Sequence, residues 1–180
     1  LGLRNMDVRI LVLYDSSGNQ LEIMADAVGQ GIRRIDGAEA LVKDISSATP
    51  EDLLDADGIV MGSPNWNGVT GRFKAWLDDV SDLANEGMME GKVGGAFTAG
   101  WGRSAGVEAT LLQLLHLELT WGMVIVGLPW TERMRTSGSY YGATVHGFLN
   151  GDDEEQARSI GARTAQMAKY MRAGGMGPPI

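Results

Sequence analysis

A short polar loop follows the first apolar run of the chain and has the composition of an anion site. The run Val8–Tyr14 leads into DSSGNQ, residues 15–20, and then into a helical pattern. At such a junction, free backbone N–H groups and the helix dipole attract an anion. Ser16 and Ser17 add hydroxyl donors, and Gly18 lets the backbone approach closely. These residue types predict a phosphate site without Lys or Arg; a serine N-cap without a ligand is the alternative.

Two tryptophans lie in two further glycine-containing loops, Ser63–Gly68 and Ala99–Gly106. Trp66 and Trp101 each offer a flat apolar face beside backbone amides, although either can also be a simple loop anchor. An anion site combined with a planar-ring site favours a mononucleotide with a large ring, and FMN fits. The patterns G-x-G-x-x-G and G-x-x-x-x-G-K-[ST] are absent, which disfavours a dinucleotide or ATP as the ligand of the first loop.

The elements that must position these loops follow from apolar periodicity. Short, near-continuous apolar runs alternate with helical patterns, which predicts buried strands of a parallel sheet. Five strands and five helices predict a doubly wound α/β three-layer sandwich with the flavodoxin-like strand order 2-1-3-4-5. In that order, the loops after strands one, three and four meet at one ligand. The expected strands are Val8–Tyr14, Glu39–Asp44, Gly58–Met61, Lys92–Thr98 and Met123–Val126.

Helix signals fill the intervals between these strands. Thr49 before Pro50, Thr70 and Asp152 are expected N-caps, and an apolar helix over residues 107–121 is expected to end before Gly122. His116 is expected to pack within that helix. His146 is expected to be a surface histidine, with a place near the mouth of the pocket as the alternative.

Composition narrows the class of protein. The chain has 180 residues, 44% of them apolar, which predicts one globular domain over residues 6–173. Residues 1–5 are expected to be an expression remnant, and residues 174–180 a frayed tail. A net charge of −8 argues against a nucleic-acid partner. No run of apolar residues is long enough for a membrane span. The absence of Cys excludes thiol chemistry and is typical of a cytoplasmic protein. With two His, no metal site is expected.

Five segments resemble the flavodoxin-like FMN proteins and, among them, the WrbA family of NAD(P)H:quinone oxidoreductases. The most specific motifs are the G-S-P loop leading into G-x-x-K-x-[WF]-[LI]-D, and G-M-V-I-V followed after a gap by Y-G-A. The resemblance implies FMN bound by all three loops, a tetramer with the flavin near subunit interfaces, and two-electron reduction of quinones by NAD(P)H. The segments are ILVLYDSSGNQLEIMADAV, GIVMGSPNWNGVTGRFKAWLD, GGAFTAGWGRSAGVEATL, WGMVIVGLPW and GSYYGATVHG.

The resemblance assigns three groups of cofactor contacts and one substrate pocket. The first group holds the phosphate, the second lines the ring and ribityl chain, and the third closes over the other part of the ring. The groups are Ser16, Ser17, Gly18, Asn19, Gln20 and Leu21; Pro64, Asn65, Trp66, Asn67 and Gly68; and Thr98, Ala99, Gly100, Trp101 and Gly102. The pocket residues that the resemblance implies are Tyr141 and Gly142 beside Ala143, and Trp121 where the family has a histidine. Arg103 of the third loop is a further candidate, because a donor near the flavin ring could stabilise its reduced form. It is either a ring or nicotinamide-phosphate contact or a solvated loop arginine.

The chain also departs from the WrbA pattern. Gly18 sits one place early, as in flavodoxins, and the loop after strand three is one residue shorter. The long insertion after strand two is missing between Asp44 and Asp57, which leaves a homodimer or a homotetramer open. A flavodoxin-type one-electron carrier is therefore the alternative function, favoured by the acidic charge and the loop tryptophans. A receiver-type signalling domain is disfavoured because strand three ends without a phospho-acceptor Asp.

Overall fold

The computed structural model describes residues 7–175, apart from the side chain of Asn19. The expected remnant, residues 1–5, and most of the expected tail, residues 174–180, lie outside the described residues. The boundaries of a domain over residues 6–173 therefore remain a prediction.

A parallel sheet forms the middle layer, and its strand order is β2-β1-β3-β4-β5. This order confirms the predicted flavodoxin-like topology. Because these strands are parallel, the loops that leave β1, β3 and β4 open at the same edge of the sheet. The order of winding reverses between β1 and β3, which leaves a crevice at that edge. The strands are β1 Val8–Tyr14, β2 Ala38–Asp44, β3 Gly58–Pro64, β4 Val93–Gly100, β5 Val124–Ile125 and β6 Ala143–His146.

The fifth position of the sheet is divided between two strands, a feature that periodicity did not predict. β5 pairs with the first two residues of β4, and β6 pairs with its last four, from Phe97 to Gly100. Since β3 occupies the other edge of β4, β5 and β6 lie end to end along the same edge. The segment between them carries the short 3-10 helix η1, Glu132–Arg135. This division brings residues that follow β6 to the same edge as the three loops.

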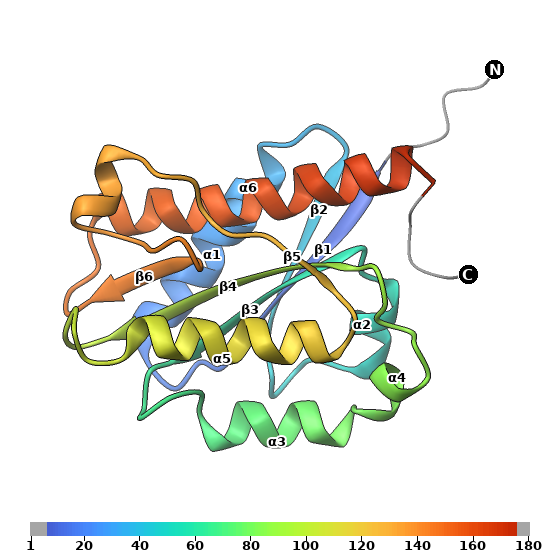
Figure 1. The fold of residues 1–180 in the computed structure, drawn as a ribbon, viewed down its shortest axis with the longest axis horizontal. Coiled ribbons are helices and arrows are strands. Elements are labelled where there is room, and N and C mark those ends of the chain that lie inside the picture. The colour runs from blue at the N-terminus through green and yellow to red at the C-terminus, as the bar shows by residue number, and fades with distance from the viewer. Residues whose placement is uncertain (1–6, 176–180) are drawn as a thin grey trace.

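Helices cover both faces of the sheet and complete the predicted three layers (Figure 1). Helices α1, Asn19–Arg33, and α6, Gly151–Ala173, pack together on one face. The other face carries α2, Pro50–Asp55; α3, Gly71–Asp79; α4, Asp82–Asn85; and α5, Val107–Thr120.

Strand β1 shows why the central strands are almost continuously apolar. Val8, Ile10 and Val12 point into the core shared with α1 and α6, whereas Leu11 and Leu13 point into the core on the opposite face. Each fully buried side chain of this size contributes about 1.5–3 kcal/mol relative to exposure. Burial of both faces therefore fixes the strand that carries the first loop.

The helix caps confirm two of the three sequence predictions. Thr49 forms a capping box with Asp52, and the Thr70 hydroxyl accepts a hydrogen bond from the Phe73 N–H at 3.3 Å. The predicted cap Asp152 is wrong because α6 begins one residue earlier, at Gly151. Its N-cap is Asn150, whose side chain accepts hydrogen bonds from two first-turn N–H groups. Asn caps helices as well as Asp does, so composition alone did not separate them.

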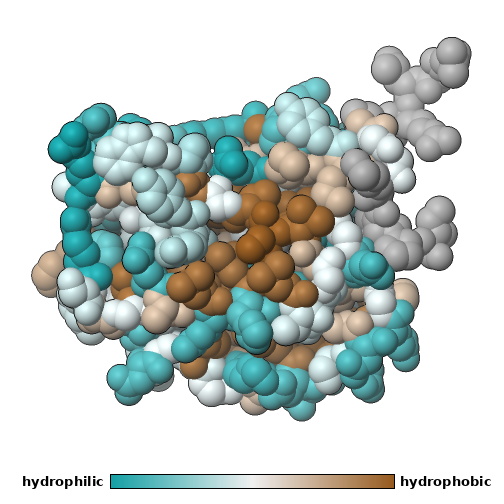
Figure 2. Space-filling view, viewed as in Figure 1, coloured by the Kyte–Doolittle hydropathy of each residue, from teal (hydrophilic) through white to brown (hydrophobic). Residues whose placement is uncertain are grey.

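Apolar side chains gather on the face where β5 forms the edge of the sheet (Figure 2). Val124 of β5 and Leu119 at the end of α5 are both exposed there. Within residues 7–175, no helix combines the length and the apolar character needed to cross a membrane. The predicted cytoplasmic location remains a prediction.

Candidate functional site

The loops after β1, β3 and β4 converge on one cavity of about 610 Å³ at the carboxyl edge of the sheet. A fourth segment, which follows β6, closes its side. The cavity is lined by Ser17, Gly18, Gln20, Leu21 and Ile23; Pro64, Asn65 and Trp66; Ala99, Gly100 and Trp101; and Phe148 and Leu149. The sequence-predicted loops therefore share a single concave surface.

Most residues predicted to contact the cofactor line this cavity, and the others lie beside it. Thr98 is buried in β4, where its hydroxyl donates to the Ser63 carbonyl at 2.7 Å. Asn67 and Gly68 form the turn of the second loop, with φ angles of 58° and 111°. Ser16 is exposed next to the cavity, and Gly102 follows Trp101 away from it. Only the backbone of Asn19 is described.

The first loop is held by two carboxylates. The Asp44 carboxylate at the end of β2 accepts the N–H of Ser16 at 2.6 Å. Buried Asp15 accepts both the N–H and the hydroxyl of Ser17, at 2.9 and 2.6 Å. Partial burial would raise the pKa of Asp44, but hydrogen bonds from Ser46 and Ser16 outweigh it and hold this pKa at about 2. Asp44 is therefore ionised at neutral pH.

A cation reaches the first loop from a distant part of the chain. The Arg72 guanidinium, in the first turn of α3, donates to the Ser17 hydroxyl oxygen at 2.9 Å. The same nitrogen lies 3.5 Å from the Asp15 carboxylate. Local sequence could not reveal this contact because 55 positions separate Arg72 from Ser17. The structure thus adds a positive charge where the sequence analysis expected none.

Asn65 ties the second loop to the third. Its side-chain amide donates to the Ala105 carbonyl at 2.6 Å, and its backbone N–H donates to the Ala99 carbonyl at 2.9 Å. Its Oδ1 atom accepts from the Thr110 hydroxyl of α5 at 2.9 Å. Asn65 therefore fixes the separation of the two loops that carry Trp66 and Trp101.

Three aromatic side chains stand at the opening of the cavity. Trp66 is 62% exposed and Trp101 is 80% exposed, so neither indole is used as a core residue. Phe148, which the sequence analysis missed, contacts Trp101 edge to face with ring centroids 6.1 Å apart. Exposed aromatic faces beside a cavity suit a planar apolar ligand.

The residues present fit FMN in shape and in chemistry. The volume lies within the range of about 300–1,000 Å³ that is common for cofactor pockets. The N-terminus of α1 has no side-chain cap, so it can receive the phosphate. The buried Oε1 atom of Gln20 has no hydrogen-bond partner among the described residues, and a ribityl hydroxyl would supply one.

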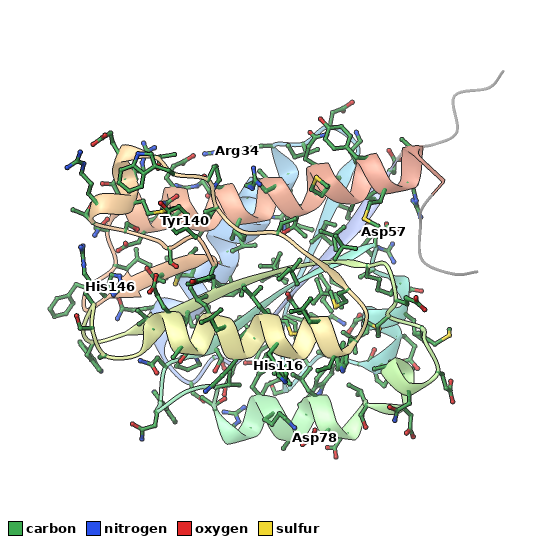
Figure 3. The ribbon with its side chains drawn as sticks, in the orientation of Figure 1. Arg34, Asp57, Asp78, His116, Tyr140 and His146 are labelled. Carbon is green, nitrogen blue, oxygen red and sulfur yellow. The ribbon has the colours of Figure 1, made fainter. Side chains whose placement is uncertain are left out.

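A second cavity, of about 460 Å³, lies between the third loop, the start of α5 and the segment between β5 and β6. Arg103, Glu108, Tyr140 and His146 are among its lining residues. Figure 3 shows Tyr140 and His146 at the same end of the molecule, near the start of α5. Burial, and then the Arg103 guanidinium, lower the pKa of His146. Half-buried His146 therefore belongs to this cavity.

The predicted substrate residues do not all come together. Arg103 lines the second cavity, and its guanidinium donates to the Arg135 carbonyl at 2.7 Å. Tyr141 donates its N–H to the hydroxyl of Ser139, which lines the same cavity, and Gly142 forms a bridge with Ser139. Trp121 is only 8% exposed and packs in the core at the far end of α5. Within this chain, Trp121 does not join the pocket.

His116 also differs from its expectation. Its side chain is exposed on α5 rather than packed, and Figure 3 shows it on the side of that helix that faces α3. It lines a shallow apolar groove with Leu112 and Lys74. Among the described residues, no group of three or more His, Cys, Asp or Glu side chains is arranged to hold a metal ion.

Comparisons with known proteins agree on the fold and identify a family. A family model described as NADPH-dependent FMN reductase matches residues 6–131. A protein of Archaeoglobus fulgidus named NAD(P)H dehydrogenase (quinone) is 36% identical over 91% of this chain and 98% of its own length. A protein of Aquifex aeolicus named flavodoxin is 33% identical over 88% of this chain and 85% of its own length. The crystal structure of a flavodoxin, WrbA-like protein from Agrobacterium tumefaciens has a TM-score of 0.74 at 25% identity, covering 91% of this chain and 99% of that one.

Proposed function

The chain belongs to the NADPH-dependent FMN reductase family, and on that premise we propose that it transfers two electrons from NAD(P)H to quinones or similar planar acceptors through bound FMN. The observation that carries the proposal is the convergence of three strand-end loops on one cavity beside two exposed tryptophans. Relatives named NAD(P)H dehydrogenase (quinone) support the choice of donor and acceptor.

Each loop has a separate task in this proposal. The first loop and the start of α1 bind the phosphate, and Gln20 pairs with the ribityl chain. Trp66 and Trp101 flank the ring and keep water from its apolar part. When bound, FMN supplies the hydride and electron chemistry, while the protein controls position, electrostatics and access.

We assign the approach of the nicotinamide or the acceptor to the second cavity and its border. Arg103 offers a guanidinium for an anionic group, and Tyr140 offers a half-exposed aromatic face beside it. Tyr141 and Gly142 shape the wall through their contacts with Ser139. Within one subunit Trp121 lies at the opposite end of α5, so a role in the pocket would require the flavin of a neighbouring subunit, as the resemblance implies for the histidine at this position.

The visible spectrum and steady-state turnover test the proposal. The purified full chain should carry or take up FMN and should oxidise NADH or NADPH when benzoquinone is present. A protein that takes up no FMN, or a flavin-loaded protein that oxidises neither nicotinamide, would contradict it. Extraction of the chromophore distinguishes FMN from FAD and riboflavin.

A flavodoxin-type one-electron carrier is the second candidate. The strong exposure of Trp101, the net charge of −8 and the Aquifex aeolicus relative named flavodoxin favour it. Photoreduction of the flavin-loaded protein separates the two functions. A reduction that halts after one electron favours the carrier, and one that passes directly to the two-electron state favours the oxidoreductase.

We also propose that the chain self-associates as a homodimer or homotetramer. The exposed apolar edge at β5, with Val124 and Leu119, supports this proposal. Light scattering behind a sizing column should give two or four times the mass of 19.2 kDa. A monomer at micromolar concentration would contradict it.

A further inference from the structure

The first loop uses much of its own hydrogen-bonding capacity internally. The N–H of Ser16 is bound to Asp44, and Ser17 directs both its N–H and its hydroxyl hydrogen to Asp15. The N–H of Gly18 donates to the Ser16 carbonyl at 2.5 Å. The Ser17 hydroxyl therefore cannot donate to a phosphate in this arrangement, contrary to the role that the sequence suggests. The remaining donors are the Ser16 hydroxyl and the start of α1.

The same two carboxylates make the loop electrostatically unfavourable for an anion. Asp15 is fully buried and Asp44 is partly buried, so water screens them only in part. A phosphate dianion at the start of α1 would approach both. The helix dipole offers only about half an elementary charge in compensation. A positive charge close to the start of α1 would therefore strengthen the binding of a phosphate.

Arg72 is positioned to supply this charge. Among the residues that the structure describes, it is the only Lys or Arg with a hydrogen bond or ion pair to residues 15–18. Its side chain is 57% exposed, so part of the guanidinium remains open to a ligand. Thr70, the N-cap of α3, donates to Asp15 at 2.5 Å and so attaches the start of that helix to the loop. Arg72 is thus held beside Ser17, which lines the cavity, by its own contacts and by the attachment of its helix to the loop.

We propose that Arg72 is the cationic partner of the terminal phosphate of FMN, and that it makes this chain select FMN over riboflavin. The inference rests on the proposed binding of FMN and adds a residue outside the predicted loops. A guanidinium can form two parallel hydrogen bonds to a phosphate, which an ammonium cannot. Its contact with Ser17 keeps the side chain close to the site before the cofactor arrives.

Paired titrations with FMN and riboflavin test this role, because the two ligands differ only in the phosphate. The full chain, freed of bound flavin, is titrated while quenching of flavin fluorescence is followed. Arg72→Gln should weaken FMN binding by about 10- to 100-fold. It should change riboflavin binding by less than about threefold, since riboflavin has no phosphate for the guanidinium to pair with. Arg72→Lys should recover part of the loss because it restores the charge without the planar fork.

Lys74→Gln is the matched control, since it removes one positive charge from the same helix. Lys74 pairs with Asp78 and lines the groove beside His116 instead of the cavity. The control should keep the ratio of FMN to riboflavin affinity. Raising the salt concentration should reduce the preference of the unmodified chain for FMN over riboflavin, because salt screens the attraction between the guanidinium and the phosphate. The preference of Arg72→Gln should change little with salt.

The outcomes separate this inference from the proposed function. If the unmodified chain prefers FMN and Arg72→Gln keeps the same preference, the inference is wrong and the proposed function stands. Equal losses for FMN and riboflavin would likewise overturn it, because they would indicate damage to the cavity. If the unmodified chain binds neither flavin, the proposed function and the inference both fail. Selective loss for FMN, with riboflavin binding retained, supports the inference.

Discussion

The rings of Trp101 and Phe148 meet edge to face, with centroids 6.1 Å apart and an interplanar angle of 86°. Trp101 follows β4, whereas Phe148 follows β6, so the contact joins neighbouring strand ends that lie far apart along the chain. An edge-to-face pair of this kind contributes about 0.5–1.5 kcal/mol beyond burial. Phe148 therefore helps to orient the Trp101 indole at the mouth of the cavity, although both rings stay largely exposed.

Replacing Trp101 should weaken flavin binding. Trp101→Ala removes one flat apolar face beside the proposed ring site, and we expect the Kd for riboflavin and FMN to rise together by about tenfold. Quenching of flavin fluorescence measures both constants. Tyr170→Ala removes another exposed aromatic ring, from α6, and should leave both constants unchanged. Unchanged binding by Trp101→Ala would show that the indole does not contact the ring.

Asp44 should make the protein more stable above pH 4 than below it. Its pKa is about 2 in the folded chain and 3.8 without these contacts, so the ionised form is favoured by folding. This stabilisation is complete above the unfolded pKa and disappears as pH falls through the folded value. Asp44→Asn should lower the free energy of unfolding at pH 7 by about 1 kcal/mol. In urea titrations, the difference should shrink between pH 4 and pH 2; a constant difference would contradict this explanation.

Much of the fold could be predicted from local patterns, because a strand that is buried on both faces has an almost continuously apolar sequence. Strand β1 begins and ends at the predicted residues, and Thr70 caps its helix as expected. Strand β6 was missed because its four residues, ATVH, are too few to establish a period. Phe148 was missed as well, because it can be placed at the edge that carries the site only if the strand before it is known.

In the candidate site, too, residues with an unusual local sequence could be predicted, whereas residues that act through long-range contacts could not. The loops around Ser17, Trp66 and Trp101 were found because their composition is unusual where they stand. Arg72 was not found because its importance comes from a contact across 55 positions. Trp121 was assigned to the pocket by resemblance, but the direction of α5 carries it to the far end of the sheet.

A close helix crossing on one face of the sheet depends on glycine. A Cβ atom on Gly161 of α6 would lie 2.2 Å from the Val28 carbonyl of α1, and backbone cannot move aside cheaply. Gly161→Ala should therefore lower the free energy of unfolding by about 2 kcal/mol or more. Gly151→Ala in the first turn of the same helix meets no atom within 4 Å and serves as the control. Thermal unfolding of the two variants measures the difference, and equal stabilities would contradict the close crossing.

Glu118 should limit stability at neutral and alkaline pH. Its carboxyl group is fully buried against Gly94 and lies beside the backbone N–H of Gly95, without a hydrogen bond of good geometry among the described residues. Burial raises the pKa of Glu118 well above 4.5, so the folded chain keeps a proton that the unfolded chain releases. The free energy of unfolding must then fall as pH rises above 4.5, until the folded group also ionises.

Glu118→Gln tests this conclusion, because it retains the size of the side chain and removes the titration. The variant and the unmodified chain should have similar free energies of unfolding near pH 4. The variant should become progressively more stable than the unmodified chain as pH rises to 8. Urea titrations at several pH values measure the difference in the free energy of unfolding between the variant and the unmodified chain. Glu118→Leu should increase this difference further if α5 accommodates the side chain, because no polar group then remains buried. A gap that does not change with pH would mean that Glu118 is ionised in the folded protein.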